Sequence, residues 1–198
     1  MDEQRISEGL TFDDVLLVFG HYQSLDGHDH RPRGVGIDTG CGTLPEGRLT
    51  VACPGTDVAA QAAGSGGPGV KILSVGSLTP RKGHRQLLEA LAGLQSLPWS
   101  LHNVGSAARD PATALDLQEA TAQLGLLQRV VWHGEVDEEA LAAHYAAADL
   151  FVLPSWHEGY GMAAAEALAH CLPVVASDAG ALAQTVPRAA GRQVPPGD

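Results

Sequence analysis

Two carboxylates and the turn between them are the residues whose types and spacing best suggest binding chemistry. Glu158 and Glu166 stand eight positions apart and enclose the Gly-Tyr-Gly turn of residues 159–161. The apolar run at residues 149–154 predicts a buried parallel strand, and the alanine-rich residues 162–170 predict a helix directly after the turn. Such a helix directs its unpaired N–H groups into the crevice beyond the strand, so this stretch predicts an anion site.

A diphosphate on the backbone N–H groups of Gly159, Tyr160 and Gly161 would have a carboxylate near each end. Glu166 lies about five residues into the predicted helix, about 7 Å along its axis, and can reach a ribose. Glu158 can face a polyhydroxylated group at the other end, because each carboxylate oxygen accepts a hydrogen bond from a hydroxyl. The alternative is a structural strand–turn–helix unit with two solvated glutamates.

A second turn is expected beside the first. Gly76 and Ser77 follow the strand predicted over Val70–Val75, and Lys82 lies at the end of the same turn. Lys82 is a mobile cation whose charge would offset a diphosphate. The alternative is a solvated lysine at the start of a helix.

Strands and helices alternate from residue 70 onward, which predicts an α/β fold with a Rossmann-like, doubly wound parallel sheet of six strands. Right-handed crossovers place helices on both faces of such a sheet. The expected strands are Val70–Val75, 100–105, 129–134, 149–154, 173–178 and Gly191–Val194, and the expected helices are 84–97, 110–125, 138–148, 162–170 and 180–186.

The Glu158-x7-Glu166 spacing with Gly-Tyr-Gly inside resembles the donor-site signature of family-4 retaining glycosyltransferases. These enzymes have the GT-B arrangement, in which two Rossmann-like domains face each other across a cleft, and the signature belongs to the second, donor-binding domain. The resemblance covers about residues 49–198. It implies retaining transfer of a sugar from a UDP- or GDP-type nucleotide diphosphate sugar to an acceptor that the sequence does not identify.

The resemblance also implies site roles. Glu158 would orient the donor sugar, and Lys82 with the helix N-terminus would stabilise the leaving diphosphate, so that no cofactor or metal is required. Gly134, Glu135 and Val136 match the loop that frames the nucleobase.

One position departs from the family pattern. Ser77 stands where many family members carry a second, cationic arginine, and Arg81 is the nearby candidate to replace that charge.

The chain divides into an N-terminal appendage of strands or an irregular arm at residues 1–50, a linker at 51–69 and the donor-binding domain at 70–198. Residues 6–18 resemble IMP dehydrogenases. Residues 18–50 resemble the tail of symmetrical diadenosine tetraphosphatases, which implies a metal-ligand role for His21, but that family's other metal motifs are missing. A composite or chimeric chain is therefore expected, with residues 1–50 mediating self-association into a homo-oligomer.

Bulk properties narrow the function classes. The formal net charge of −11 at pH 7 argues against a nucleic-acid surface, which would carry a basic patch. No apolar run approaches the roughly 20 residues of a membrane-spanning helix, and the acidic N-terminus lacks the plan of a signal peptide. Three widely spaced cysteines fit a reducing cytoplasm.

Two functions remain open. The first is a glycosyltransferase donor domain, weak or inactive alone because the acceptor domain is missing. The second is a non-catalytic nucleotide-binding or scaffold module, engineered or derived from a fragment. Turnover of a donor sugar by the chain would distinguish them.

Overall fold

The structure is a computed structural model that describes residue 56 and residues 59–198 of the 198-residue chain. The predicted appendage at residues 1–50 lies outside the described residues, as do its two resemblances and His21. The predicted self-association therefore stays a prediction.

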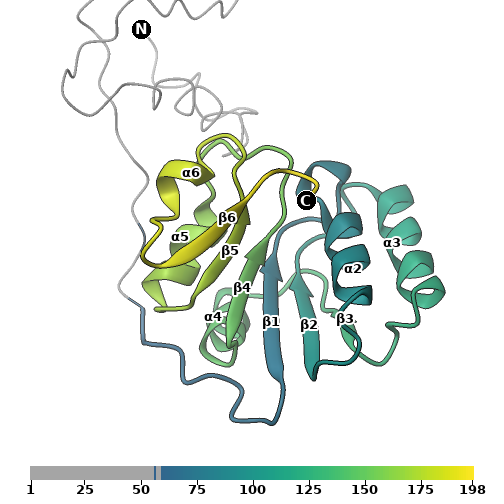
Figure 1. Cartoon of the computed structure of the whole chain (residues 1–198), viewed down its shortest axis with the longest axis horizontal. Coiled ribbons are helices and arrows are strands. Elements are labelled where there is room, and N and C mark those ends of the chain that lie inside the picture. The colour runs from purple at the N-terminus through teal and green to yellow at the C-terminus, as the bar shows by residue number, and fades with distance from the viewer. Residues whose placement is uncertain (1–55, 57–58) are drawn as a thin grey trace, which may run out of the picture.

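One sheet of six strands, parallel at every pairing, forms the centre of the domain. The strand order is β3-β2-β1-β4-β5-β6 (Figure 1). The predicted six-stranded, Rossmann-like parallel sheet is thus confirmed. The strands are β1 (Val70–Val75), β2 (Trp99–Val104), β3 (Val130–Trp132), β4 (Leu150–Leu153), β5 (Val174–Ser177) and β6 (Gly191–Val194).

Helices cover both faces of the sheet, as predicted. Two buried clusters show that α2 and α3 pack on one face, whereas α4, α5 and α6 pack on the other. Figure 1 shows α4 behind the sheet, with α2 and α3 on the near side. The helices are η2 (Pro80–Lys82), α2 (His84–Ala92), α3 (Pro111–Gln123), α4 (Glu138–Ala146), α5 (Met162–Ala169) and α6 (Leu182–Thr185).

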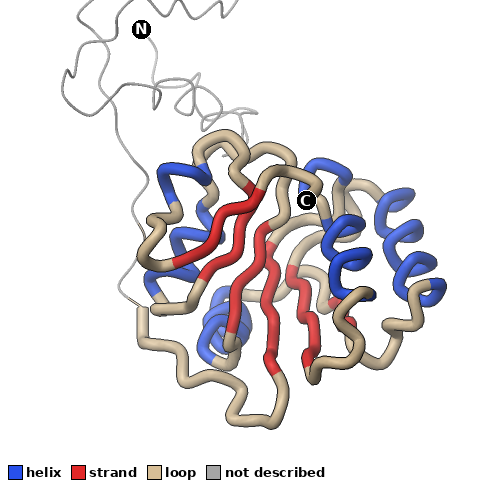
Figure 2. Tube along the Cα trace, in the orientation of Figure 1, coloured by secondary structure: helices blue, strands red, loops and turns tan. Residues whose placement is uncertain are grey.

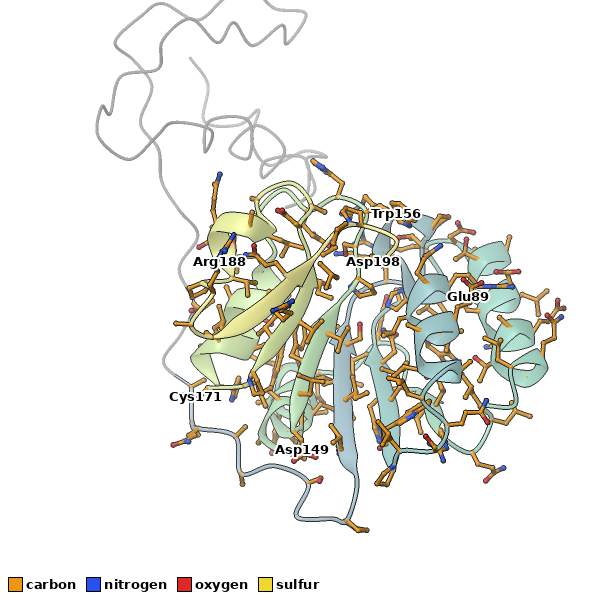
Figure 3. All side chains as sticks on the ribbon, in the orientation of Figure 1. Glu89, Asp149, Trp156, Cys171, Arg188 and Asp198 are labelled. Carbon is orange, nitrogen blue, oxygen red and sulfur yellow. The ribbon has the colours of Figure 1, made fainter. Side chains whose placement is uncertain are left out.

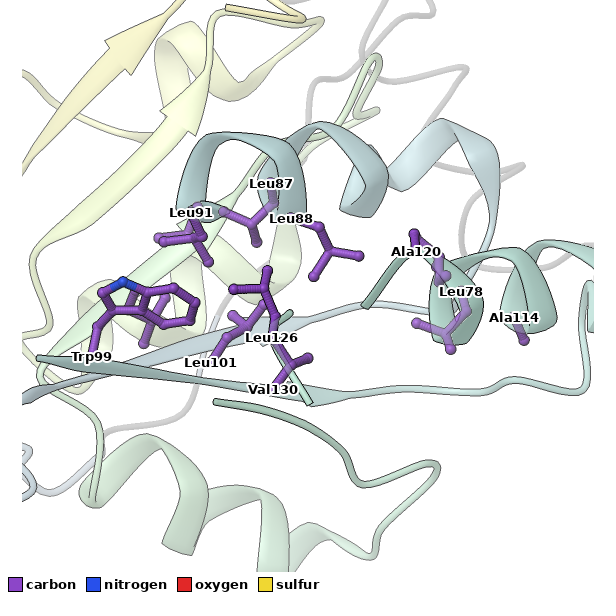
Figure 4. Close-up of a cluster of buried hydrophobic side chains, with 13 residues drawn as sticks. Leu78, Leu87, Leu88, Leu91, Trp99, Leu101, Ala114, Ala120, Leu126 and Val130 are labelled. Carbon is purple, nitrogen blue, oxygen red and sulfur yellow. The ribbon is translucent and has the colours of Figure 1, made fainter. Parts of the chain in front are cut away.

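The core on the α2 face is rich in leucine. Leu87, Leu88 and Leu91 project from α2 toward the sheet, where they meet Leu101 of β2 and Val130 of β3 (Figure 4). Each fully buried side chain of this kind stabilises the fold by about 1.5–3 kcal/mol. This packing fixes α2, and with it the turn that precedes α2.

The core on the opposite face brings α5 close to the sheet. Ala164 and Ala167 are completely buried, and they share a cluster with Phe151 of β4 and Val174 of β5. Because alanine side chains are short, the α5 backbone can approach these strands closely. The start of α5 is therefore held against the carboxyl end of β4.

The helix expected at residues 84–97 is shorter than predicted. It ends at Ala92, and Leu94 and Leu97 are 45% and 54% exposed. The chain must turn back after α2 so that Trp99 can pair with Val70 at the start of β1. The Trp99 indole N–H donates to the Leu94 carbonyl, and the residues between α2 and β2 therefore form turns. The prediction was too long because the leucine spacing continues to residues that lie outside the core.

Two helix starts follow the sequence prediction closely. Asp110 accepts a hydrogen bond from the Thr113 backbone N–H at 3.0 Å and precedes α3. Asp137 accepts from the Ala140 backbone N–H at 2.8 Å and precedes α4. Both carboxylates satisfy N–H groups that have no partner within the helix.

The strand order reverses direction between β1 and β4. Beyond the carboxyl ends of this strand pair lies the position where doubly wound sheets bind ligands. Loops at that edge are drawn in tan in Figure 2. Figure 3 shows Trp156, which follows β4, at this edge and Asp149, which precedes β4, at the opposite one. The turns after β1 and β4 must therefore lie side by side.

Part of the predicted linker lies against the domain. The backbone N–H groups of Ala62 and Ala63 donate to the carbonyls of His170 and Ala146, at 2.9 Å each. These contacts join the segment to the C-terminal ends of α4 and α5. Within the described range, none of the helices is both long and apolar enough to cross a bilayer.

One buried histidine is held in its neutral form by its surroundings. His84 is 3% exposed, and its Nε2 lies 2.8 Å from the Asn103 amide nitrogen, which can only donate. Nε2 therefore accepts, and the ring is neutral. Burial, followed by the charge of Lys82, lowers the pKa of His84 from 6.5 to about 4.

We expect this histidine to lower stability in acid. The unfolded chain protonates it near pH 6.5 but the folded chain only near pH 4, so its contribution is complete above pH 6.5 and is lost on acidification toward pH 4. The loss is about 3 kcal/mol. Urea unfolding at about pH 7.5 and 4.5 should show a smaller drop in His84→Gln than in the parent. An identical drop in both proteins would contradict this assignment.

Candidate functional site

The turns after β1 and β4 meet at Gly83 and Pro154. Gly83 has φ +69°, and a Cβ there would collide with the Pro154 carbonyl oxygen. The Trp156 N–H also donates to the Arg81 carbonyl at 2.8 Å. Glycine thus permits the close approach that brings Lys82, the preceding residue, beside the β4–α5 turn.

Lys82 and Glu158 form an ion pair across this contact. Lys82 Nζ lies 2.6 Å from Glu158 Oε1, and the two side chains are only 13% and 6% exposed. Ser155 Oγ donates to the same Oε1 at 2.6 Å. The buried carboxylate therefore has a cation and a hydroxyl as partners, as desolvated charges require.

A second cation faces Glu158. Arg81 Nη1 lies 3.5 Å from Glu158 Oε2 and donates to the His157 carbonyl at 2.7 Å. Ser177 of β5 donates through Oγ to the Ser155 carbonyl, and this hydrogen bond anchors the β4–α5 turn to the neighbouring strand.

Glu158 does not use all the donors of the Lys82 ammonium. The Lys82 ammonium has three N–H donors and gives one to Glu158, which leaves two for another acceptor. The sequence predicted both residues for the site, but it did not predict that they pair.

The start of α5 borders the same turn. Gly161 is the N-cap residue with φ +86°, and no side chain caps the helix. Its carbonyl accepts from the N–H groups of Ala164 and Ala165, so the earlier N–H groups have no partner inside the helix. The position of Glu158 is also fixed from α6, because the Ala181 N–H donates to the Glu158 carbonyl at 3.0 Å.

Glu166 lies apart from the Lys82 pair, on the side of α5 that faces α4. The Tyr145 hydroxyl donates to Glu166 Oε2 at 2.9 Å. Both residues line a groove of about 670 Å³ between α4 and α5, together with Glu138, Leu141 and Met162 among others. Ligand pockets commonly range from about 300 to 1,000 Å³.

The predicted base loop follows β3. Gly134 has φ +72°, and its carbonyl accepts from the Gly105 N–H at 2.8 Å. Val136 packs against the core of the α4 face, whereas Glu135 is exposed. Gly134 is thereby held at the same edge of the sheet as the β1 turn.

The start of the β1 turn is joined to the β2 loop. The Gly76 N–H donates to the Val104 carbonyl at 2.9 Å, and the Leu78 N–H donates to the Ser106 carbonyl at 2.8 Å. Ser77 lies between these two anchored positions. A Cβ at Gly76 would lie 3.3 Å from Lys82 Cδ, so Gly76 leaves room for the lysine stem.

Three histidines lie close together beside the predicted base loop. His102 Nδ1 lies 3.0 Å from His133 Nε2, and the His133 and His144 rings lie 4.3 Å apart. Burial is the main cause that lowers the pKa of all three, and the Lys71 charge adds to it. In the described part of the chain, no three His, Cys, Asp or Glu side chains are arranged to hold a metal ion.

Two side-chain contacts of the predicted glutamates were not anticipated from the sequence. Ser155 and Tyr145 contact the two predicted glutamates, although neither was expected to do so. Ser155 follows the predicted strand directly, and its position could have indicated a role. Tyr145 carries no local signal, because its contact spans 21 residues and depends on how α4 packs against α5.

Comparisons with known proteins agree with this arrangement. Residues 69–198 match the family described as glycosyl transferases group 1. A D-inositol 3-phosphate glycosyltransferase from Xylanimonas cellulosilytica is 37% identical over 117 residues, which are 58% of this chain and 27% of that protein. This chain thus spans little more than a quarter of that relative's length.

Two solved structures share the fold. The C-terminal domain of a group 1 family protein, LpcC from Francisella tularensis, is 27% identical with a TM-score of 0.63, covering 72% of this chain and 80% of that chain. Anabaena HepE in complex with UDP and glucose is 28% identical with a TM-score of 0.61, covering 66% of this chain and 35% of that chain. The family match begins at residue 69, so the N-terminal resemblances stay predictions.

The buried pair leads to a prediction about stability. Lys82→Met leaves Glu158 desolvated with its closest cation gone, and we expect the free energy of unfolding to fall by roughly 2–3 kcal/mol. Adding Glu158→Gln removes the stranded charge and should recover part of this loss. A double-mutant cycle by urea unfolding measures the coupling. Strictly additive effects of the two substitutions would rule out a stabilising pair.

Proposed function

This chain belongs to the group 1 glycosyl transferases, and we propose that its described domain binds the nucleotide diphosphate sugar from which a sugar is transferred. The observation that carries the proposal is the Lys82–Glu158 pair beside the start of α5. Lys82 supplies two further N–H donors, and α5 supplies backbone N–H groups and the positive end of its dipole. Together they form a site for a diphosphate.

Glu166 provides the next contact. It lies one turn inside α5, in the groove that separates this helix from α4. A ribose beyond the diphosphate would place its hydroxyls on this carboxylate, and the base would lie near Gly134, Glu135 and Val136. The nucleotide would then span the distance from Lys82 to the α4–α5 groove.

The transfer step requires stabilisation of a leaving diphosphate. Lys82 and the start of α5 carry positive charge at the place where this step needs it. Glu158 holds Lys82 in position and orients the donor sugar. We propose transfer with retention of the anomeric configuration and without a required cofactor.

The donor is proposed to be of the UDP or GDP type. HepE, which shares the fold, was solved with UDP and glucose, and this supports a uridine nucleotide here. The groups proposed to bind donor all lie in this domain, so we expect the domain by itself to bind donor and to transfer sugar weakly or not at all. A domain that binds no nucleotide would instead be a scaffold module.

Calorimetry with UDP, GDP and the matching monophosphates tests the proposal. Lys82→Ala should weaken diphosphate binding about ten-fold and monophosphate binding less, because a charge-assisted hydrogen bond contributes about 1.5–3 kcal/mol. Glu166→Ala should weaken both classes about ten-fold through loss of the ribose contacts.

Arg129→Ala is the matched control, because this cation directly precedes β3, at the opposite edge of the sheet, where it donates to the carbonyls of Leu97 and Gln95. It should leave every affinity unchanged. Equal losses in all three variants would indicate general destabilisation. If the parent chain binds none of the nucleotides at millimolar concentration, the donor-site proposal is wrong.

A further inference from the structure

The Tyr145 hydroxyl is a fixed donor to Glu166. Tyr145 is 2% exposed, and its oxygen lies 2.9 Å from Glu166 Oε2 and 3.2 Å from the Ala163 carbonyl. Burial and then the Glu166 charge raise the pKa of Tyr145, so the hydroxyl keeps its proton. With one proton and two acceptors, the shorter and charge-assisted bond to the carboxylate is the favoured one.

The ring that carries this hydroxyl is held on two sides. It packs against Phe151 at a centroid distance of 5.9 Å and stacks on His170 at 5.0 Å with an interplanar angle of 12°. His170 Nδ1 in turn lies 2.8 Å from the Ala60 carbonyl, which can only accept. The donor therefore has a defined position before any ligand arrives.

Glu166 keeps accepting capacity on the groove side. A carboxylate offers about four lone-pair sites, and Tyr145 uses one of them. Among residues 59–198, no other hydrogen bond to the Glu166 side chain is found. Both residues line the groove between α4 and α5, so the remaining sites are available to hydroxyls that enter it.

We propose that Tyr145 is a positioning residue that fixes the Glu166 carboxylate for the vicinal hydroxyls of a ribose. This inference rests on the proposed donor function and adds a selectivity to it, namely preference for ribonucleotides over deoxyribonucleotides. A long glutamate side chain loses rotamer freedom when it binds, and a carboxylate already held by Tyr145 loses less. A site built to bond a hydroxyl also discriminates against an analogue that lacks it.

The test compares UDP and GDP with their 2′-deoxy and 3′-deoxy analogues by calorimetry. The parent should prefer the ribonucleotide about ten-fold, as expected for loss of one charge-assisted hydrogen bond. Tyr145→Phe keeps the ring but removes the donor, and this preference should fall to about three-fold or less. Glu166→Gln should reduce it similarly, and the double variant should match Glu166→Gln alone, because Tyr145 acts through the carboxylate.

Thr121→Val is the matched control. Thr121 donates through a buried hydroxyl to the Leu117 carbonyl on α3, away from the groove, so its loss should leave the ribose preference unchanged. If Tyr145→Phe weakens ribo- and deoxynucleotides equally, or keeps the parent preference, Tyr145 has only a structural role. If the parent binds no nucleotide, the proposed donor function itself is wrong. If the parent binds ribonucleotides and deoxyribonucleotides equally, Glu166 does not bind the ribose.

Discussion

The ion pair between Lys82 and the buried Glu158 connects the two turns on which the whole site depends. Each turn follows a central strand of the sheet, and without the pair each would hold a largely buried, unpaired charge. A carboxylate that is 5% exposed is stable there only because Lys82, Ser155 and Arg81 surround it. The pair therefore serves the fold and the site together, and it pre-positions a cation that still has donors to offer.

The sheet order makes this pairing possible. Since β1 and β4 are neighbours, residues 76–83 and 154–161 leave the sheet at the same place, although about 75 residues separate them. The short side chains of Ala164 and Ala167 then bring the start of α5 against β4. Packing, charge and helix geometry all meet at the edge of the sheet beyond β1 and β4, and Tyr145 contacts the second glutamate in the groove between α4 and α5.

The sequence predicted the type of each β-strand and α-helix because its signals are local, whereas it predicted only a turn where the short helix η2 lies. Apolar runs bounded by glycine or proline marked the strands, and Asp110 and Asp137 marked two helix starts. The end of α2 was mispredicted because the position of β2, a tertiary constraint, overrides the leucine pattern at Leu94. The contacts of Glu166 with Tyr145 could not be predicted, since they depend on the packing of two helices rather than on spacing along the chain.

The most direct test of this account is a crystal structure of the chain with a nucleoside diphosphate. We expect the terminal phosphate within hydrogen-bonding distance of Lys82 Nζ and of the first N–H groups of α5, with the Lys82–Glu158 contact retained and the ribose on Glu166. Lys82 has donors for both partners, so the pair need not break. A nucleotide bound elsewhere, or bound at this edge of the sheet without contact to Lys82, would contradict the central claim.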